Sequence, residues 1–148
     1  MRRSDLENVF FGLVSDQYRV TSPETAEYNC IAWAAGDVTR WWWPDALHLA
    51  FWPPGARREE SVEAFVRMYE LLGFAECETA ELEPGFERIA LFAVADRPKH
   101  AARQLPHGSW TSKLGKDVDI EHALPDIEGE LYGQVVRIMK RPYSGGVR

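Results

Sequence analysis

A cysteine and a histidine are the residues of this sequence best suited to nucleophilic chemistry. Cys30 stands in "EYNCIAW", after an asparagine and before a run of helix-forming apolar residues. A thiol is a useful nucleophile when a helix N-terminus or an imidazole stabilises its thiolate and substrate can reach it. The first condition is met if Asn29 caps a helix that begins at Cys30. The alternative is a packed, unreactive thiol, because free cysteine is often buried.

His100 is the best candidate for the imidazole that such a thiol needs. It follows the turn "DRPK" and begins "HAARQL", which we expect to form an antiparallel hairpin with "SWTSKLG" across "PHG". Pairing of Leu105 with Trp110 is the expected register, although the loop length leaves it open by one residue. In that register His100 shares a polar face with Thr111 and Lys113. The ring would then act as the general base for the thiol.

A third group would hold the imidazole through the ring nitrogen that does not face sulfur. The candidates follow the second hairpin strand and are Asp117, Asp119 and His122. We favour Asp119 because "DIEH" opens the next element. The backbone amide of Cys30 is the natural oxyanion donor at the helix start, and the sequence identifies no second donor.

These residues resemble a known family of enzymes. "YNCIAW" is similar to the cysteine signature of NlpC-type papain-like peptidases, which place a histidine at a later strand start and a polar residue on the following strand. The order Cys30, His100 and Asp119 matches that pattern. The resemblance implies a thiol hydrolase or transferase that acts on an amide, isopeptide or acyl bond through an acyl-enzyme.

The sequence also departs from the NlpC pattern. Asn29 stands where that pattern usually has aspartate, no Ser-Gly pair follows the cysteine, and the N-terminus does not read as a signal peptide. These departures argue against peptidoglycan hydrolysis outside the cell.

A second resemblance covers nearly the whole chain. "YNCIAWA", "HAARQ", "WTSKLG" and "DIEH" together are similar to a small bacterial domain family of unknown function. This resemblance implies no activity. Two alternatives to catalysis therefore stay open: a noncatalytic interaction module of the same fold, whose Trp-rich segment binds a protein, and a small regulator of the immunity or antitoxin type.

The secondary-structure elements that must position these residues follow one order along the sequence, with the predicted helices first and the predicted strands after them. Ser4 and Glu7 form a capping-box pattern that predicts a helix over about residues 5–14. Its packing residues would be Val9, Phe10 and Leu13.

The next segments show the same order. "TSPETAEYNCIAWAAGD" predicts either one helix from Pro23 through Cys30 or a short helix from Cys30 that Gly36 ends. "REESVEAFVRMYELLG" predicts a helix from its apolar spacing. "FERIALFAVA" predicts a central strand, "DIEHALPDIEG" a short helix or turn, and "YGQVVRIMKRP" a last strand. We therefore predict one α+β domain over residues 1–148, papain-like or NlpC-like, with N-terminal helices packed on a small antiparallel β-sheet and a flexible tail at 143–148.

Tryptophans are concentrated near an expected ordered loop over residues 37–55, where prolines interrupt any regular period. Trp41, Trp42 and Trp43 cannot all point inward from an extended segment. At least one of them is therefore a candidate wall beside the active site or part of a binding surface.

Composition restricts the function further. The 148-residue chain is 45% hydrophobic and 27% charged, with a formal net charge of −6, which argues against nonspecific binding to nucleic acid or membranes. No stretch reaches the ~18 to 20 apolar residues of a membrane span. Two separated cysteines make no disulfide framework, so we expect a cytoplasmic setting. The histidines are scattered without C-x2-C or H-x3-H pairs, so we predict neither metal nor other cofactor. The expected partner is a peptide, protein or acyl substrate.

Overall fold

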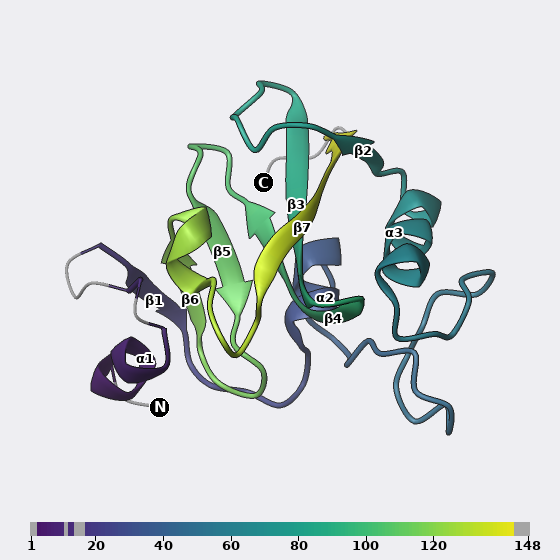
Figure 1. Ribbon diagram of the computed structural model, residues 1–148, viewed down its shortest axis with the longest axis horizontal. Helices are drawn as coiled ribbons and strands as arrows, with labels where there is room; N and C mark the ends of the chain where they lie inside the picture. The colour runs from purple at the N-terminus through teal and green to yellow at the C-terminus, as the bar shows by residue number, and fades with distance from the viewer. Residues whose placement is uncertain (1–2, 11, 14–16, 144–148) are drawn as a thin grey trace.

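An antiparallel sheet forms the framework of the protein. The computed structural model describes residues 3–10, 12–13 and 17–143, and in it seven strands lie side by side in the order β1-β6-β5-β4-β3-β7-β2 (Figure 1). All paired strands are antiparallel. The strands are β1 (Arg19–Ser22), β2 (Ala75–Cys77), β3 (Phe86–Val94), β4 (Arg97–Gln104), β5 (Trp110–Lys113), β6 (Asp119–His122) and β7 (Gln134–Pro142).

Short helices surround this sheet. They are α1 (Arg3–Val9), α2 (Cys30–Ala35), α3 (Val62–Leu71) and the 3-10 helix η1 (Leu124–Ile127). Figure 1 shows α1 beside the β1 and β6 end of the sheet and α3 beyond β2 at the other end. Within the described ranges, every helix is too short or too polar to traverse a lipid bilayer.

The two faces of the sheet bury two separate apolar clusters. Side chains alternate between faces along a strand, so Leu91 and Ala101 pack with α2 and α3 on what we call the α2 face. Ala90 and Ala102 pack with residues of the N-terminal segment on the α1 face. Because both faces are covered, β3 is a nearly continuous apolar strand, as predicted for a central position.

Several predicted elements are confirmed, including α2 beginning at Cys30, α3, β3 and the irregular loop over residues 37–55. The first helix is shorter than predicted and ends at Val9, which is exposed, while Phe10 and Leu13 beyond it are buried. The capping role predicted for Ser4 depends on its side chain, which lies outside the part of the chain that the structure describes. "DIEH" forms strand β6 and not a helix or turn, and only the following "LPDI" is helical.

The hairpin register differs from the predicted one by one residue. Gln104, not Leu105, pairs with Trp110, and the Leu105 amide donates to the Ser109 carbonyl inside the turn. A slip of one residue moves every side chain of a strand to the other face. His100 therefore lies on the α1 face opposite Phe92 of β3, away from the face of Thr111.

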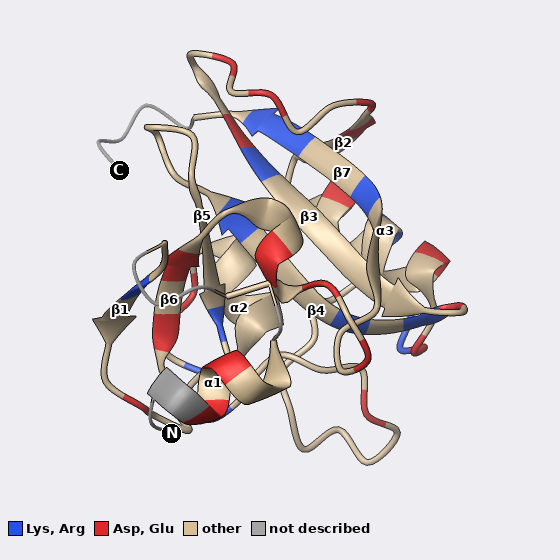
Figure 2. Ribbon diagram, turned by 60° about the vertical axis from the view of Figure 1, so that its left-hand side comes forward, with Lys and Arg blue, Asp and Glu red and all other residues tan. Residues whose placement is uncertain are grey.

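Ion pairs link β7 to β2, to β3 and to the loop between them. On β7, Arg137 pairs with Glu76, Lys140 with Glu83 and Arg141 with Glu87. Figure 2 shows the corresponding blue and red segments interleaved over β2, β3 and β7. Basic residues on this surface are therefore matched by acidic neighbours.

Gly133 provides a test of how the segment before β7 is fixed. Its φ is 76°, and an added Cβ would overlap the carbonyl oxygen of Ala93. Gly36 has a similar φ of 88° but no atom within 4 Å of an added Cβ. We expect Gly36→Ala to lower the free energy of unfolding by about 1 kcal/mol and Gly133→Ala to lower it by more, as measured by urea denaturation. Equal losses would show that Gly133 matters only for its φ.

Candidate functional site

Cys30 occupies the first position of a capped helix. The Asn29 side-chain oxygen accepts a hydrogen bond from the Ala32 amide at 3.2 Å, and Gly36 ends the helix in the left-handed conformation. Asn29 also binds the Trp-rich loop, since it accepts from the Trp42 amide at 3.1 Å and donates to the Trp42 carbonyl at 2.7 Å. One side chain thus places both the thiol and the loop beside it.

The thiol faces a cavity of about 340 Å³ whose lining residues are Asn29, Cys30, Trp41, Trp43, Lys99, Gly115 and Tyr132. Cys30 is 7% exposed. Burial raises the pKa of the thiol to about 11, against the effect of backbone N–H groups of Ala101, Ile31 and Cys30 itself, which favour the thiolate. Desolvation outweighs these donors, so the thiol is neutral near pH 7.

His100 belongs to a buried polar chain on the α1 face. Its Nε2 lies 2.9 Å from Ser112 Oγ, and the same oxygen lies 2.7 Å from His122 Nε2. His122 Nδ1 lies 2.7 Å from the Ala123 carbonyl oxygen. His100, Ser112 and His122 therefore connect β4, β5 and β6 through side-chain hydrogen bonds.

The direction of each hydrogen bond follows from the carbonyl at the end of the chain. Burial lowers the pKa of His122 to about 4, so its ring is neutral, and Nδ1 must donate because a carbonyl only accepts. His122 Nε2 then accepts from the Ser112 hydroxyl, which in turn accepts from His100 Nε2–H. Desolvation and the neighbouring His122 hold the pKa of His100 well below its usual range. His100 Nδ1 is thus a buried acceptor that has no hydrogen-bond partner among the described residues.

The structure does not join Cys30 to His100 by a hydrogen bond, since neither His100 nitrogen has sulfur as a partner. The two residues belong to opposite faces of the sheet because of the register. Tyr132 lies near both residues. Its ring stacks on the His100 ring with centroids 4.1 Å apart, and it also lines the cavity that holds Cys30. The predicted dyad is therefore not in contact in this conformation.

Asp119 does not hold the imidazole. Its carboxylate accepts a hydrogen bond from the Tyr28 hydroxyl at 2.7 Å on the α2 face, and burial together with that bond raises the pKa of Tyr28. Asp117 accepts from the Val118 amide at 2.8 Å. Of the three candidates for the third group, only His122 reaches His100, and it does so through Ser112.

Ser112 is the functional candidate that the sequence analysis missed. It stands in "WTSKLG", which was already singled out as a motif. With Gln104 paired to Trp110, the alternation along the hairpin places Ser112 and His100 on one face. The correct register would have identified it.

Lys113 binds three backbone carbonyl groups near the thiol. Its ammonium is fully buried and donates to the carbonyl oxygens of Thr25, at 2.7 Å, Gly115, at 2.9 Å, and Asp117. Three acceptors satisfy all three hydrogens of the ammonium, although desolvation still lowers its pKa. We assign Lys113 a structural role, because no hydrogen of its ammonium remains for substrate.

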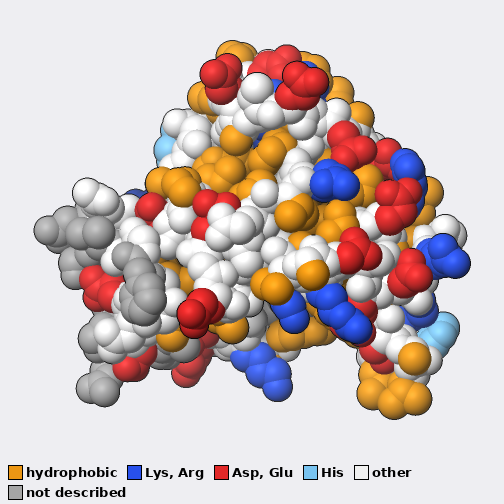
Figure 3. All heavy atoms as spheres, in the orientation of Figure 1, with side chains coloured by type: hydrophobic (Ala, Val, Ile, Leu, Met, Phe, Trp, Pro, Cys, Tyr) orange, Lys and Arg blue, Asp and Glu red, His pale blue; other side chains and the backbone are white. Residues whose placement is uncertain are grey.

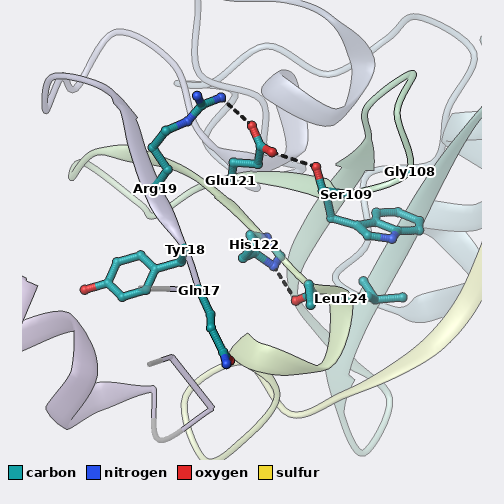
Figure 4. A pocket seen from close by; sticks show the side chains of 10 residues that line it. Gln17, Tyr18, Arg19, Gly108, Ser109, Glu121, His122 and Leu124 are labelled. Carbon is teal, nitrogen blue, oxygen red and sulfur yellow. Dashed lines mark hydrogen bonds and ion pairs between the residues drawn. The ribbon is translucent and has the colours of Figure 1, made fainter. Parts of the chain in front are cut away.

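A second cavity, of about 570 Å³, lies beside β1 and β6 and contains His122 in its wall. Figure 4 shows Arg19, Glu121 and Ser109 joined across this cavity. Hydrogen bonds from His107 and Ser109 hold the pKa of Glu121 at about 2, so its carboxylate is ionised and already bound. Among the described residues, no three His, Cys, Asp or Glu side chains come together as metal ligands.

The two cysteines give a test of the neutral thiol. Because the pKa of Cys30 is about 11, roughly one molecule in ten thousand carries the thiolate at pH 7. We expect iodoacetamide to modify Cys77 before Cys30 at pH 7, and the Cys30 rate to rise about tenfold per pH unit up to pH 9. Peptide mass spectrometry reports each site. A Cys30 rate that is high at pH 7 and constant above it would show an activated thiolate instead.

Stability should depend on pH through His122. Its folded-state pKa of about 4 lies below the ordinary 6.5, so the unfolded chain binds more protons and the folded state loses stability as pH falls below 6.5. We expect about 2 kcal/mol of this loss between pH 7 and pH 5, and His122→Gln should remove it in urea denaturation at the two pH values. The exposed His48, changed to Asn, is the control and should leave the pH dependence as it is. An unchanged dependence in His122→Gln would contradict the assignment.

Comparison with known proteins identifies a family. A family model described as a domain of unknown function (DUF7689) matches residues 19–140, a segment that includes Cys30, His100 and Ser112. No curated protein and no solved structure matches the chain. The matched segment is most of the 148 residues. The chain therefore belongs to the DUF7689 family.

Proposed function

We propose that the protein is a papain-like thiol hydrolase or transferase with Cys30 as its nucleophile. The observation that carries the proposal is the position of Cys30 at the start of a capped helix and in the wall of a cavity. The Ala101, Ile31 and Cys30 amides near the sulfur favour negative charge there. An arrangement of this kind suits attack on a carbonyl carbon.

His100 is the proposed proton acceptor. Its Nε2–H donates to Ser112, which leaves Nδ1 as the basic nitrogen, and no residue in the described part of the chain is a partner of Nδ1. In unliganded sites catalytic hydrogen bonds are often long and form only with substrate. The proposal therefore requires a rearrangement of β4 that brings His100 Nδ1 from the α1 face to the Cys30 thiol when substrate fills the cavity. Tyr132, which stacks on His100 and lines the Cys30 cavity, would have to shift as well.

The proposed reaction has two steps. Cys30 Sγ forms a bond to the acyl carbon while its proton passes to His100 Nδ1, and the proton then goes to the leaving amine or alcohol as that bond breaks. Water, or another acceptor in a transferase, next attacks the thioester and gives its proton to His100. The sulfur leaves as thiolate and recovers that proton, which restores the neutral pair.

A noncatalytic interaction module is the second candidate. The neutral thiol and the missing contact between Cys30 and His100 favour it. On this alternative the Trp-rich loop binds a protein partner, and Cys30 is only a member of the buried apolar cluster that also contains Ala101.

Acylation of Cys30 separates the two candidates. We expect p-nitrophenyl acetate to acetylate the protein at Cys30, detected by intact mass and peptide mapping. Cys30→Ser should abolish that adduct, and the matched variant Cys77→Ser should retain it, because Cys77 lies on β2 away from the cavity. His100→Ala should slow acetylation by about 10² to 10⁴-fold, the usual contribution of a general base. An absence of acetylation at Cys30, or a Cys30 acetylation rate that His100→Ala leaves unchanged, would rule out the catalytic role.

A further inference from the structure

We propose that Trp41, Trp43 and Leu49 form a binding site for the apolar acyl group of the substrate. This inference rests on the proposed function, because it names the part of the substrate that lies beside the carbon attacked by Cys30. The site lies on the loop between α2 and α3.

A separate cavity of about 360 Å³ adjoins the one that holds the thiol. Its lining residues are Trp41, Trp43, Asp45, Leu49 and Ala50. Trp41 and Trp43 also line the Cys30 cavity, so these two indole rings border both cavities. A group bonded to a carbonyl at Cys30 can therefore extend along the rings toward Leu49.

The backbone of the loop determines which tryptophans face this surface. Trp42 is buried, and its backbone forms a bridge with Phe51. In this bridge the Trp43 amide donates to the Phe51 carbonyl at 3.0 Å, and the Phe51 amide donates to the Trp41 carbonyl at 2.9 Å. Neighbouring side chains of an extended segment point in opposite directions. Trp41 and Trp43 therefore point away from Trp42. Both are half-buried and line the cavity, and the Trp43 ring also packs edge-on against Phe65 of the core, with ring centroids 5.3 Å apart.

The end of the loop is also held in place. The Asp45 carboxylate accepts from the Leu49 amide at 2.8 Å and the Ala50 amide at 3.0 Å. Arg58 donates to the carbonyl oxygens of Asp45, at 2.8 Å, and Ala50, at 3.0 Å. These bonds keep Leu47 and Leu49 in the open, 79% and 85% exposed. Figure 3 shows hydrophobic side chains gathered at this end of the loop, at the lower right. A preorganised apolar surface binds its ligand with a smaller loss of conformational entropy.

The chemistry of the lining indicates an apolar ligand. Asp45 is the charged residue of the 360 Å³ cavity, and its carboxylate is already bonded to two amides and to Arg58. The remaining walls are two indoles and two aliphatic side chains. A cavity of this size and composition suits an alkyl chain or one aromatic ring.

Binding of simple amides tests the site without requiring turnover. We would titrate Cys30→Ser with acetamide, butanamide and hexanamide and follow the tryptophan indole N–H signals by NMR. Each methylene that enters the cavity should tighten binding by up to about fourfold, so hexanamide should bind clearly best.

Leu47 and Leu49 give a matched pair of variants, since both are exposed and two residues apart but only Leu49 lines the cavity. We expect Leu49→Ala to weaken hexanamide binding by about fourfold or more and Leu47→Ala to leave it unchanged. Equal effects of the two variants, or no gain with chain length, would overturn the acyl site. If the chain-length dependence and the Leu49 effect appear while Cys30 is never acylated, the site stands and the thiol hydrolase proposal fails.

Discussion

The Asn29 side chain is the constraint on which the candidate site depends. Its oxygen caps α2 and accepts from the Trp42 amide, while its nitrogen donates to the Trp42 carbonyl. The side chain is itself almost fully buried, where an unmet hydrogen bond costs more than at the surface. The cap therefore places Cys30 at the helix start, and the same atoms turn Trp42 inward. The cavity walls that follow from this are Trp41 and Trp43.

The low polarity of the protein interior determines the protonation states of Cys30 and His100. Desolvation outweighs the amide donors at Cys30 and raises its pKa, and desolvation with a neighbouring histidine lowers that of His100. A neutral thiol and a neutral imidazole are the result, not the thiolate–imidazolium pair of an activated cysteine. Lys113 is a buried group that keeps its charge, because three backbone carbonyls accept hydrogen bonds from its ammonium.

Local patterns in the sequence predicted the elements, while the site depended on pairing between them. Asn29 and Gly36 mark the ends of α2 because capping is decided within a few residues. The register of the hairpin is decided by its turn and by packing on both faces, and a shift from Leu105 to Gln104 opposite Trp110 moved His100 to the other face. For the same reason Asp119 meets Tyr28, and Ser112 was overlooked as the partner of His100. The short edge strands β1 and β2 carry mostly exposed residues and show no alternating apolar pattern from which the sequence could have predicted them.

The buried chain from His100 to Ala123 limits what the imidazole can do. His122 is fixed as an acceptor by the Ala123 carbonyl, so Ser112 must donate to it and can offer His100 only a lone pair. His100 is thereby held with Nε2 protonated and Nδ1 basic, the state that a general base needs before it takes a proton. If His100 became cationic, its new proton would reside on Nδ1, and the existing hydrogen bonds would remain in the same directions. The chain therefore fixes the ring in both protonation states. For the thiol to serve as the donor to Nδ1, Cys30 and His100 must first come together from opposite faces of the sheet.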